Sequence, residues 1–391
     1  MRVPAFSLLL AFSLAPLLAG CDEARDPAQP RPTRLTADAA GNSSPNYEIV
    51  DLGTLGGNVS QATSLNDSDQ VAGWSEIADE LQHRHAFLWA HGTMQDLGTL
   101  GGCCSRADAV NVAGQVAGVT TTASGQWHAF LWTAGQMQDL GPAFFQTDAF
   151  VYLNDAGEAA WTAGSPGAPT RAMRWSGGAA QDIGTLGGTS SVVGGINQAG
   201  AVAGNSDAPT PAHQDAFLWT PAAGIQDLGN LGDQMVSAAL NARGEVVGQC
   251  IINPSSPSYR AWLWDGGQLV DLGALSSLNA AGYGFRVNNR GQVLVQQVFW
   301  DHGTPTSPIG LASITMNQRG IVVGQASIAR EVDHAAVWQD GQVTDLGAPN
   351  TLGDPASSFP AAINAAADVA GWFGDGQFEG VRHAALWRRV Q

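Results

Sequence analysis

The stretch from His85 to Gly118 reads HAFLW-AHGT-MQDLG-TLGG-CCSRADAV-NVAG-QVAG, and its motifs return until the C-terminus. Each copy has a segment that ends in Trp, an Asp-Leu-Gly-type motif and an Asn-x-x-Gly-type turn, and most copies are 43–45 residues apart. Eight copies at such a period predict a solenoid, an array or a propeller. The turns begin at Asn66, Asn111, Asn154, Asn197, Asn241, Asn288, Asn317 and Asn364, with a shortened unit around 288–310. The tryptophans are Trp89, Trp132, Trp175, Trp219, Trp264, Trp300, Trp338 and Trp387, and the aspartates are Asp51, Asp96, Asp139, Asp182, Asp227, Asp271 and Asp345.

Each copy is predicted to hold four short strands. Around Asn111 these are Ala107–Asn111, Gln115–Gly118, Ala129–Trp132 and Met137–Gly141. Four strands in about 40–45 residues are typical of a propeller blade, whereas a parallel β-helix needs shorter rungs and fewer hairpins. Because a buried Trp removes about 150–250 Å² from water, we expect the tryptophans to form the core between blades.

The polar motifs are predicted to be turns and caps. In Asn-x-x-Gly, Asn caps its own backbone and Gly takes the left-handed position of a bulge. Asp69 and Ala367 replace that Gly in two copies, which weakens the prediction there. A catalytic acid does not need seven copies, so the Asp-Leu-Gly aspartates are expected to cap the Gly-rich loop that follows them.

The two ends of the repeat region complement one another. Tyr47–Gly53 is a fourth strand with no first three before it, and the last unit has only three strands. Closing the ring with Tyr47–Gly53 removes exposed strand edges. We therefore predict an all-β fold over 47–391, an eight-bladed β-propeller of four-stranded blades closed by the N-terminal strand. A seven-bladed propeller and a β-solenoid are the alternatives.

Composition restricts the function classes. The net charge is −17, and the 17 basic residues are all arginines. Nucleic-acid binding requires basic patches, so we expect no nucleic-acid partner. The absence of Lys excludes Schiff-base chemistry at a lysine.

The N-terminus resembles a bacterial lipoprotein signal. Residues 1–20 contain Arg2 and an apolar run, and Leu18–Cys21 resembles a lipobox, which implies cleavage before Cys21 and a diacylglyceryl group on its sulfur. Residues 21–46 are polar and Pro-rich, which indicates a disordered tether behind the lipidated Cys21. The chain is thus expected in the bacterial cell envelope, bound to a membrane through lipid, periplasmic or at the cell surface.

Loops between the second and third strands vary most, on the same face as the links between copies. Divergent loops on a repeated scaffold suggest a binding face. Its candidate residues are the aromatic side chains Trp127, Tyr259, Trp372, Phe373 and Phe378.

Other reactive side chains carry weaker signals. His85, His128, His334 and His383 share one register, where other copies have Arg171, Asp215 and Arg260, so we expect polar structural roles and no metal. The neighbouring Cys103 and Cys104 could form a vicinal disulfide outside the cytoplasm. No motif predicts a cofactor or a catalytic residue.

Segments such as His85–Trp89, Met94–Gly102 and Ile196–Gly204 resemble the bacterial extracellular repeats of the HAF family, over almost all of 47–391. The resemblance implies export and a repeat architecture, and adds no catalytic residue. We expect a monomeric binding or scaffold module for a protein or glycan partner, more a binding protein than an enzyme. The alternatives are an enzyme that acts on glycans, a quinone-dependent dehydrogenase, and a structural envelope protein without a ligand.

Overall fold

The computed structural model describes residues 34–36, 47–145, 150–165, 167–209, 213–232, 234–252, 259–275, 285–306, 309–329, 332–349, 357–374 and 380–390. Across these residues the fold is all β, with strands and turns and no helix. Accordingly, they include no helix with the length and apolarity to cross a membrane. Contacts divide the chain into Met1–Pro30 and Arg31–Gln391, and every described residue belongs to the second unit. The predicted signal (1–20) and Cys21 lie outside the described residues.

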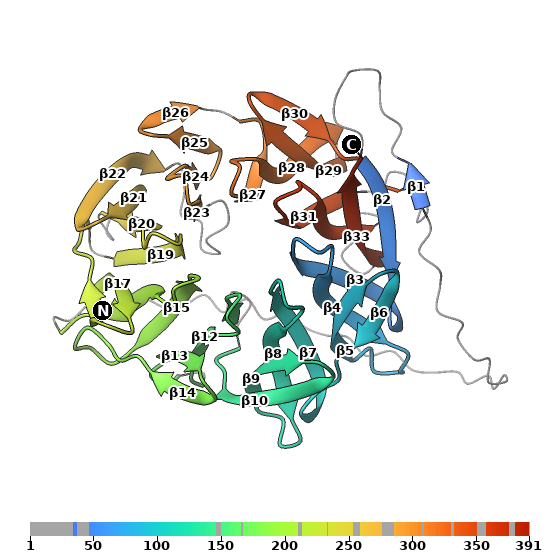
Figure 1. Ribbon diagram of the computed structural model, residues 1–391, viewed down its shortest axis with the longest axis horizontal. Helices are drawn as coiled ribbons and strands as arrows, with labels where there is room; N and C mark the ends of the chain where they lie inside the picture. Colours follow the sequence, from blue (N-terminus) through green and yellow to red (C-terminus); the bar gives the residue numbers. More distant parts are fainter. Residues whose placement is uncertain are drawn as a thin grey trace, which may run out of the picture. The chain divides into compact units, whose positions relative to one another are not determined.

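Antiparallel ladders of four strands follow one another along the chain and, within this unit, around a common centre (Figure 1). The ladders in the first half are β3 (Gly56–Leu65), β4 (Val71–Ile77), β5 (Arg84–Ala90) and β6 (Thr93–Asp96); β7 (Gly101–Val110), β8 (Val116–Thr122), β9 (Trp127–Thr133) and β10 (Gln136–Pro142); β11 (Tyr152–Leu153), β12 (Ala159–Ala163), β13 (Arg171–Ser176) and β14 (Ala179–Asp182); and β15 (Ser191–Ile196), β16 (Val202–Asp207), β17 (Gln214–Thr220) and β18 (Gly224–Asp227).

The second half continues the pattern, with its shortest strands in the unit around 288–310. Its ladders are β19 (Gln234–Leu240), β20 (Val246–Ile251), β21 (Tyr259–Asp265) and β22 (Gln268–Leu275); β23 (Phe285–Val287), β24 (Val293–Val295), β25 (Val298–Asp301) and β26 (Thr304–Thr306); β27 (Ala312–Met316), β28 (Val322–Ala329), β29 (Val332–Gln339) and β30 (Gln342–Asp345); and β31 (Ser357–Ile363), β32 (Val369–Gly374) and β33 (Arg382–Arg389).

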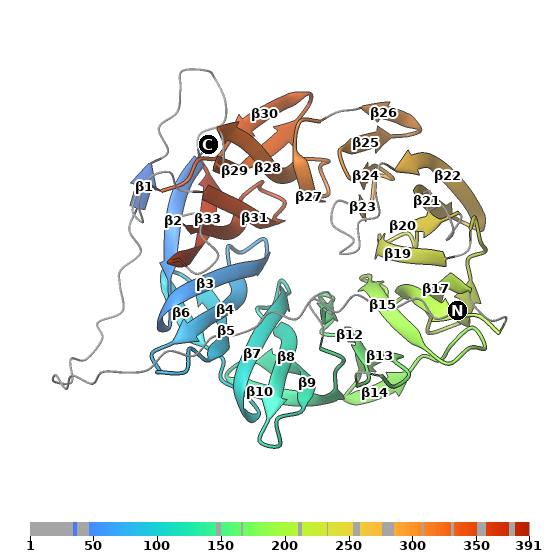
Figure 2. The ribbon, with the colours of Figure 1, turned by 180° about the vertical axis from the view of Figure 1, so that it is seen from behind.

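The last ladder takes its fourth strand from the N-terminal side of the unit. β2 (Tyr47–Gly53) pairs antiparallel with β33, with Tyr47 opposite Arg389 and Asp51 opposite Ala385. A three-residue strand, β1 (Arg34–Thr36), pairs with β2 inside the segment predicted as a tether. Both views place β2 beside β33 and next to the first ladder (Figure 2). The predicted pairing of Tyr47–Gly53 with the last unit is therefore confirmed.

The hydrophobic core lies between ladders, because each sheet buries its faces against its neighbours. One cluster joins Val50, Leu52 and Leu386 of the last ladder to Phe87 and Trp89 of the first. Similar clusters join the other neighbours along the chain. Six of the eight repeated tryptophans are at most 8% exposed, as predicted. Trp175 and Trp300 are half-buried instead, in the two units whose sequences depart most from the repeat.

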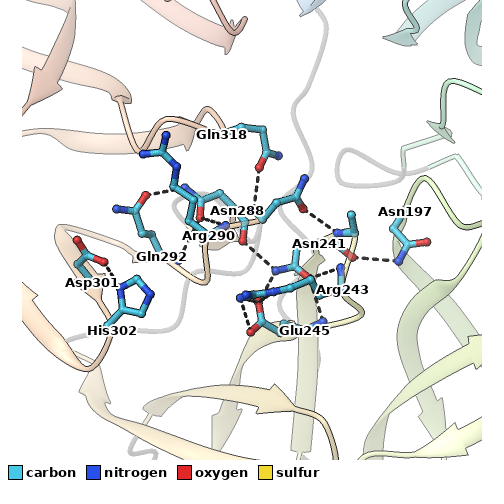
Figure 3. A network of polar contacts seen from close by, with 12 residues as sticks. Asn197, Asn241, Arg243, Glu245, Asn288, Arg290, Gln292, Asp301, His302 and Gln318 are labelled. Carbon is cyan, nitrogen blue, oxygen red and sulfur yellow. Dashed lines mark hydrogen bonds and ion pairs between the residues drawn. The ribbon is translucent and has the colours of Figure 1, made fainter.

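A buried asparagine in each Asn-x-x-Gly turn hydrogen-bonds to the next turn. The Nδ2 of Asn111 donates to the carbonyl of Asn154 (3.0 Å), and the same contact runs from Asn241 to Asn288 (2.8 Å; Figure 3). The last turn returns to the first, since Asn364 Nδ2 donates to the Asn66 carbonyl at 3.4 Å. We call this series the asparagine circle; its other contacts start at Asn66, Asn154, Asn197, Asn288 and Asn317.

Each asparagine is also bonded within its own turn, as predicted. The Oδ1 of Asn111 accepts the N–H groups of Ala113 (3.1 Å) and Gln115 (3.0 Å), and its Nδ2 donates to the Gln115 side chain (2.8 Å). The turn Gly114 has a φ of 74°, the expected left-handed value. Asp69 (57°) and Ala367 (74°) keep this conformation without a glycine, so the turn prediction holds in those copies too, at a cost in strain.

Removing one amide from the circle should destabilise the fold, because Asn111→Ala takes from the Asn154 carbonyl one of its two donors and leaves the N–H groups of Ala113 and Gln115 without their acceptor. We expect a loss of about 2–4 kcal/mol in the free energy of unfolding, measured by urea denaturation. Asn364→Ala should cost a similar amount if the last turn is joined to the first.

The neighbouring Val112→Ala is the control, because Val112 is 52% exposed and should change stability by less than about 0.5 kcal/mol. A normal urea midpoint for Asn364→Ala beside a lowered midpoint for Asn111→Ala would show that the two end turns are not joined.

Candidate functional site

The repeated histidines serve the scaffold. Each donates its Nδ1–H to the carboxylate of an Asp-Leu-Gly motif on the paired strand. The pairs are His85–Asp96, His128–Asp139, His334–Asp345 and His383–Asp51, at 2.8–3.1 Å. Arginines take the same place at Asp182 and Asp271. The expected structural role is confirmed, and among the described residues no three His, Cys, Asp or Glu side chains are placed to hold a metal ion.

The Asp-Leu-Gly aspartates also cap their own motifs. In all seven copies Oδ1 accepts the N–H of the glycine two residues on, at 2.7–2.9 Å, which confirms the prediction. Burial raises the pKa of Asp96, but the bonds from His85 and Gly98 outweigh it and lower that pKa, as His334 and Gly347 do for Asp345. In the copy where Asp215 takes the histidine position, burial and the nearby Asp227 raise the pKa of Asp215, against the smaller opposing effects of Asn230 and His213.

A serine contact joins neighbouring ladders, and it could not be assigned from the sequence. Ser105 Oγ donates to the Gly98 carbonyl (2.6 Å) and accepts the N–H of Ala86 (2.8 Å) in the preceding ladder. Ser60 makes the same bridge from Gly53 to Ala384 of the last ladder. The most repeated polar side chains are therefore engaged in the scaffold, and a ligand site must use other residues.

A hollow of about 260 Å³ lies where the Asn turns of the first, second, third, seventh and last ladders meet. We call it the central opening. Val112, Asp67 and Asp155 line it, each directly after an Asn of the circle. These positions touch across turns, since Asp155 accepts the Val112 N–H (3.1 Å) and Asp67 accepts the Ala365 N–H (2.8 Å). The backbone here is fixed by the circle, while the residue after Asn changes from copy to copy.

A larger hollow of about 510 Å³ lies beside the end of β33, and we call it the junction pocket. Arg319, Arg388 and Arg389 line it together with Asp69 and Asp368. Arg388 Nε donates to Asp69 at 3.1 Å, and the Arg389 backbone N–H donates to Asp368 at 2.7 Å. The side chains come from Asn turns and from the last strand, and two of them, Asp69 and Arg388, are 319 residues apart in the sequence.

Electrostatics in the junction pocket follow from burial and from like charge. Burial and the neighbouring Asp368 carboxylate raise the pKa of Asp69, against the opposing effect of Arg388. Burial also raises the pKa of the nearby Tyr47 to about 12, with Arg389 acting in the opposite direction. One signal for this site was present in the sequence, because Asp69 and Ala367 are the two turn residues that replace glycine.

Both hollows lie at the end of the ladders that carries the Asn turns. The predicted binding face is the other end, where the links between copies meet the second-to-third-strand loops: Leu55 N–H, for example, donates to Ser75 Oγ at the end of β4 (2.8 Å). Parts of five of those loops lie outside the described residues, and the loop face stays a prediction.

The aromatic candidates for that face differ in their surroundings. Trp127 stacks on Phe145 and Trp372 on Phe359, each pair 3.9 Å apart, and both tryptophans are half-buried. Tyr259 is half-buried at the start of β21. Phe378 lies outside the described residues.

Trp372 and Phe373 were expected in an exposed loop, and this is wrong. β32 continues to Gly374, so both are strand residues, and the Phe373 side chain is fully buried between the last two ladders.

Cys103, Cys104 and Cys250, the cysteines that the structure describes, are free thiols, so the vicinal disulfide considered for Cys103 and Cys104 is not formed in this structure. Cys103 is exposed and Cys104 is half-buried. Burial and the neighbouring Cys103 raise the pKa of Cys104 to about 11, and burial raises that of Cys250 to about 11. Thiols with raised pKa values are poor nucleophiles at neutral pH.

Solved structures with a similar fold are β-propellers. The Dos1 propeller is 10% identical over 87% of this chain and 94% of its own, with a TM-score of 0.52. The β-propeller domain of the Trilobed protease from Pyrococcus furiosus is 9% identical over 72% of this chain and 95% of its own (TM-score 0.46). TolB from Acinetobacter baumannii is 14% identical over 55% of this chain (TM-score 0.36), and the match spans about half, 54%, of TolB.

No protein-family model and no curated protein matches the sequence. At 10% identity the Dos1 match shows the fold alone.

The hydrogen bonds between the repeated histidines and the Asp-Leu-Gly aspartates make the free energy of unfolding depend on pH. Because the folded state lowers the pKa of Asp96 and Asp345, their contribution is complete above the unfolded value of about 3.9 and is lost as pH falls through the folded value. We expect the urea midpoint to fall between about pH 5 and pH 3. The Asp96→Asn/Asp345→Asn variant should be less stable at pH 7 and should lose less over that window.

Asp340→Asn, in the exposed turn after β29, is the control and should follow the parent protein at both pH values. If the urea midpoints of the Asp96→Asn/Asp345→Asn variant and of the parent fell in parallel with pH, a contribution from the lowered pKa values of these carboxylates would be contradicted.

Proposed function

We propose that this protein is a lipid-anchored, extracytoplasmic β-propeller of eight blades that binds a protein or glycan partner at its central opening. Three observations support a closed ring: β2 pairs with β33, one core cluster joins the last ladder to the first, and Asn364 contacts Asn66. The all-β fold and its similarity to solved propellers are consistent with this architecture.

The observation that carries the binding proposal is the contrast between fixed and variable positions at the central opening. Every Asn of the circle is at most 7% exposed and is used in the scaffold. The residue after it is accessible at Asp67, Val112 and Gln318, and it differs in charge and size. A rigid rim that presents acidic, amide and apolar side chains is a surface suited to one partner.

Catalysis on a glycan is less well supported. Glycoside hydrolysis usually needs two carboxyl groups about 5–9.5 Å apart. In the junction pocket the two carboxylates are already engaged, Asp69 by Arg388 Nε and Asp368 by the Asn364 amide and the Arg389 N–H.

A charged side chain placed in the opening should block the partner. We expect Val112→Arg to weaken binding by about 10-fold or more, because Val112 is 52% exposed and lines the opening. Binding is measured on a glycan array and by capture from a bacterial envelope extract, with purified protein immobilised at equal density.

Val343→Arg is the matched control, since Val343 is 44% exposed on the outer strand β30 and does not line the opening. Equal binding by the two variants would contradict a site at the central opening. A blank result in both assays would favour the structural envelope role.

The membrane anchor depends on one sulfur. We expect the parent protein to partition into the detergent phase of Triton X-114 and Cys21→Ser to partition into the aqueous phase, because the variant cannot carry the lipid. Cys103→Ser, which changes an exposed thiol, should behave as the parent. Detergent partitioning of Cys21→Ser would refute the anchor.

A further inference from the structure

The junction pocket gathers positive charge in an acidic protein. The chain carries a net charge of −17 and 17 arginines, and three of these, Arg319, Arg388 and Arg389, line this one hollow. Its volume of about 510 Å³ is within the range of small-molecule sites, about 300–1,000 Å³. The overall negative charge opposes an anion only weakly at contact, because charges farther away than about 8 Å are screened at physiological salt.

The guanidinium groups keep donors available for a ligand. Each has five N–H donors. Within the described part of the chain, Arg388 uses Nε on Asp69, and Arg319 donates to the Ala365 carbonyl at 3.3 Å. The Arg389 contact to Asp368 is made by its backbone N–H, not by its side chain. The contacts named here use only some of the guanidinium donors. The planar guanidinium group can bind a ligand carboxylate through two parallel hydrogen bonds.

The two carboxyl groups supply acceptors beside these donors. Asp368 is oriented by Asn364 Nδ2 (3.0 Å) and by the Arg389 N–H, and Asp69 by Arg388. An ionised carboxylate accepts at about four lone-pair sites, so acceptor capacity for ligand hydroxyls remains.

Backbone strain also concentrates here. The left-handed turn position is glycine in the other six copies, but it is Asp69 and Ala367 in the two turns next to this pocket. A non-glycine residue in that conformation costs about 1–3 kcal/mol, and such strain is typical of ligand sites. At Asp69 the strained position places a carboxylate at the pocket wall.

We propose that the junction pocket binds a sugar acid, with the ligand carboxylate on Arg319 and Arg389 and the ligand hydroxyls on Asp69 and Asp368. Donors and acceptors side by side fit a molecule that is both anionic and hydroxylated. A neutral sugar lacks the anion, and inorganic phosphate lacks the row of hydroxyls. The site is separate from the partner site proposed above, because Val112 does not line it.

Titration calorimetry of the full-length protein with galacturonate and galactose tests the proposal, since the two probes differ only at the carboxylate. We expect galacturonate to bind at least about 10-fold more tightly than galactose, and inorganic phosphate to bind more weakly than galacturonate. Arg319→Gln/Arg389→Gln should weaken galacturonate binding by about 10-fold or more.

Arg319→Gln alone is a second variant, because Arg319 is exposed and lies outside the Asp69–Arg388 pair, so its loss should leave folding intact. Arg243→Gln is the matched control, an arginine at the same turn position that pairs with Glu245 away from the pocket. The proposal is overturned if galacturonate gives no binding, if galactose or phosphate binds as tightly, or if the Arg319 variants match Arg243→Gln. Normal partner capture beside any of these results would leave the binding function standing.

Discussion

The buried asparagine amide is the interaction on which the rest of the structure depends. A side-chain amide out of water is costly unless its donors and its acceptor are used, and in this fold most of the partners of each amide are backbone groups of its own turn and of the next one. Asn111 illustrates the constraint, because its Oδ1 fixes Ala113 and Gln115 while its Nδ2 holds the Asn154 carbonyl. A ladder cannot rotate or slide against its neighbour without leaving a buried group unpaired, so the residue after each Asn is presented at a fixed place.

The opposite end of the ladders is held by a different set of polar contacts, which likewise join each ladder to its neighbour. A His or Arg pairs with the Asp-Leu-Gly carboxylate, that carboxylate accepts its own glycine N–H, and Ser105-type bridges reach the preceding ladder. Between the two ends the core consists of clusters shared by neighbours. Stability is therefore built from contacts between adjacent modules, and each module can vary at positions that none of these contacts use.

Local features of this fold could be predicted from the sequence, and contacts between modules could not. Strand number, the Asn turns and the Asp caps follow from periodicity and turn chemistry, which act within a few residues. Phe373 was misplaced because only the length of β32 decides whether it is a strand or a loop residue. The circle joins residues 29 to 47 apart along the chain and 298 apart where the last turn meets the first, and the sequence has no local signal for which amide proton crosses to the next turn. Asp69 and Arg388 are 319 residues apart, so their pocket required the fold.

The junction pocket exists because one ladder is assembled from two segments. Elsewhere the third strand turns back at once into the fourth, as Ala90 and Thr93 do between β5 and β6, and that tight turn covers the end of the ladder. In the last ladder β33 pairs with β2 instead, so no such turn covers this end in the described part of the chain. Arg388 and Arg389 line the hollow at this end, next to the two turns in which Asp69 and Ala367 replace glycine. The break in the repeat thus brings together at one place a hollow, three arginine side chains and the carboxylate of Asp69 in a left-handed turn position.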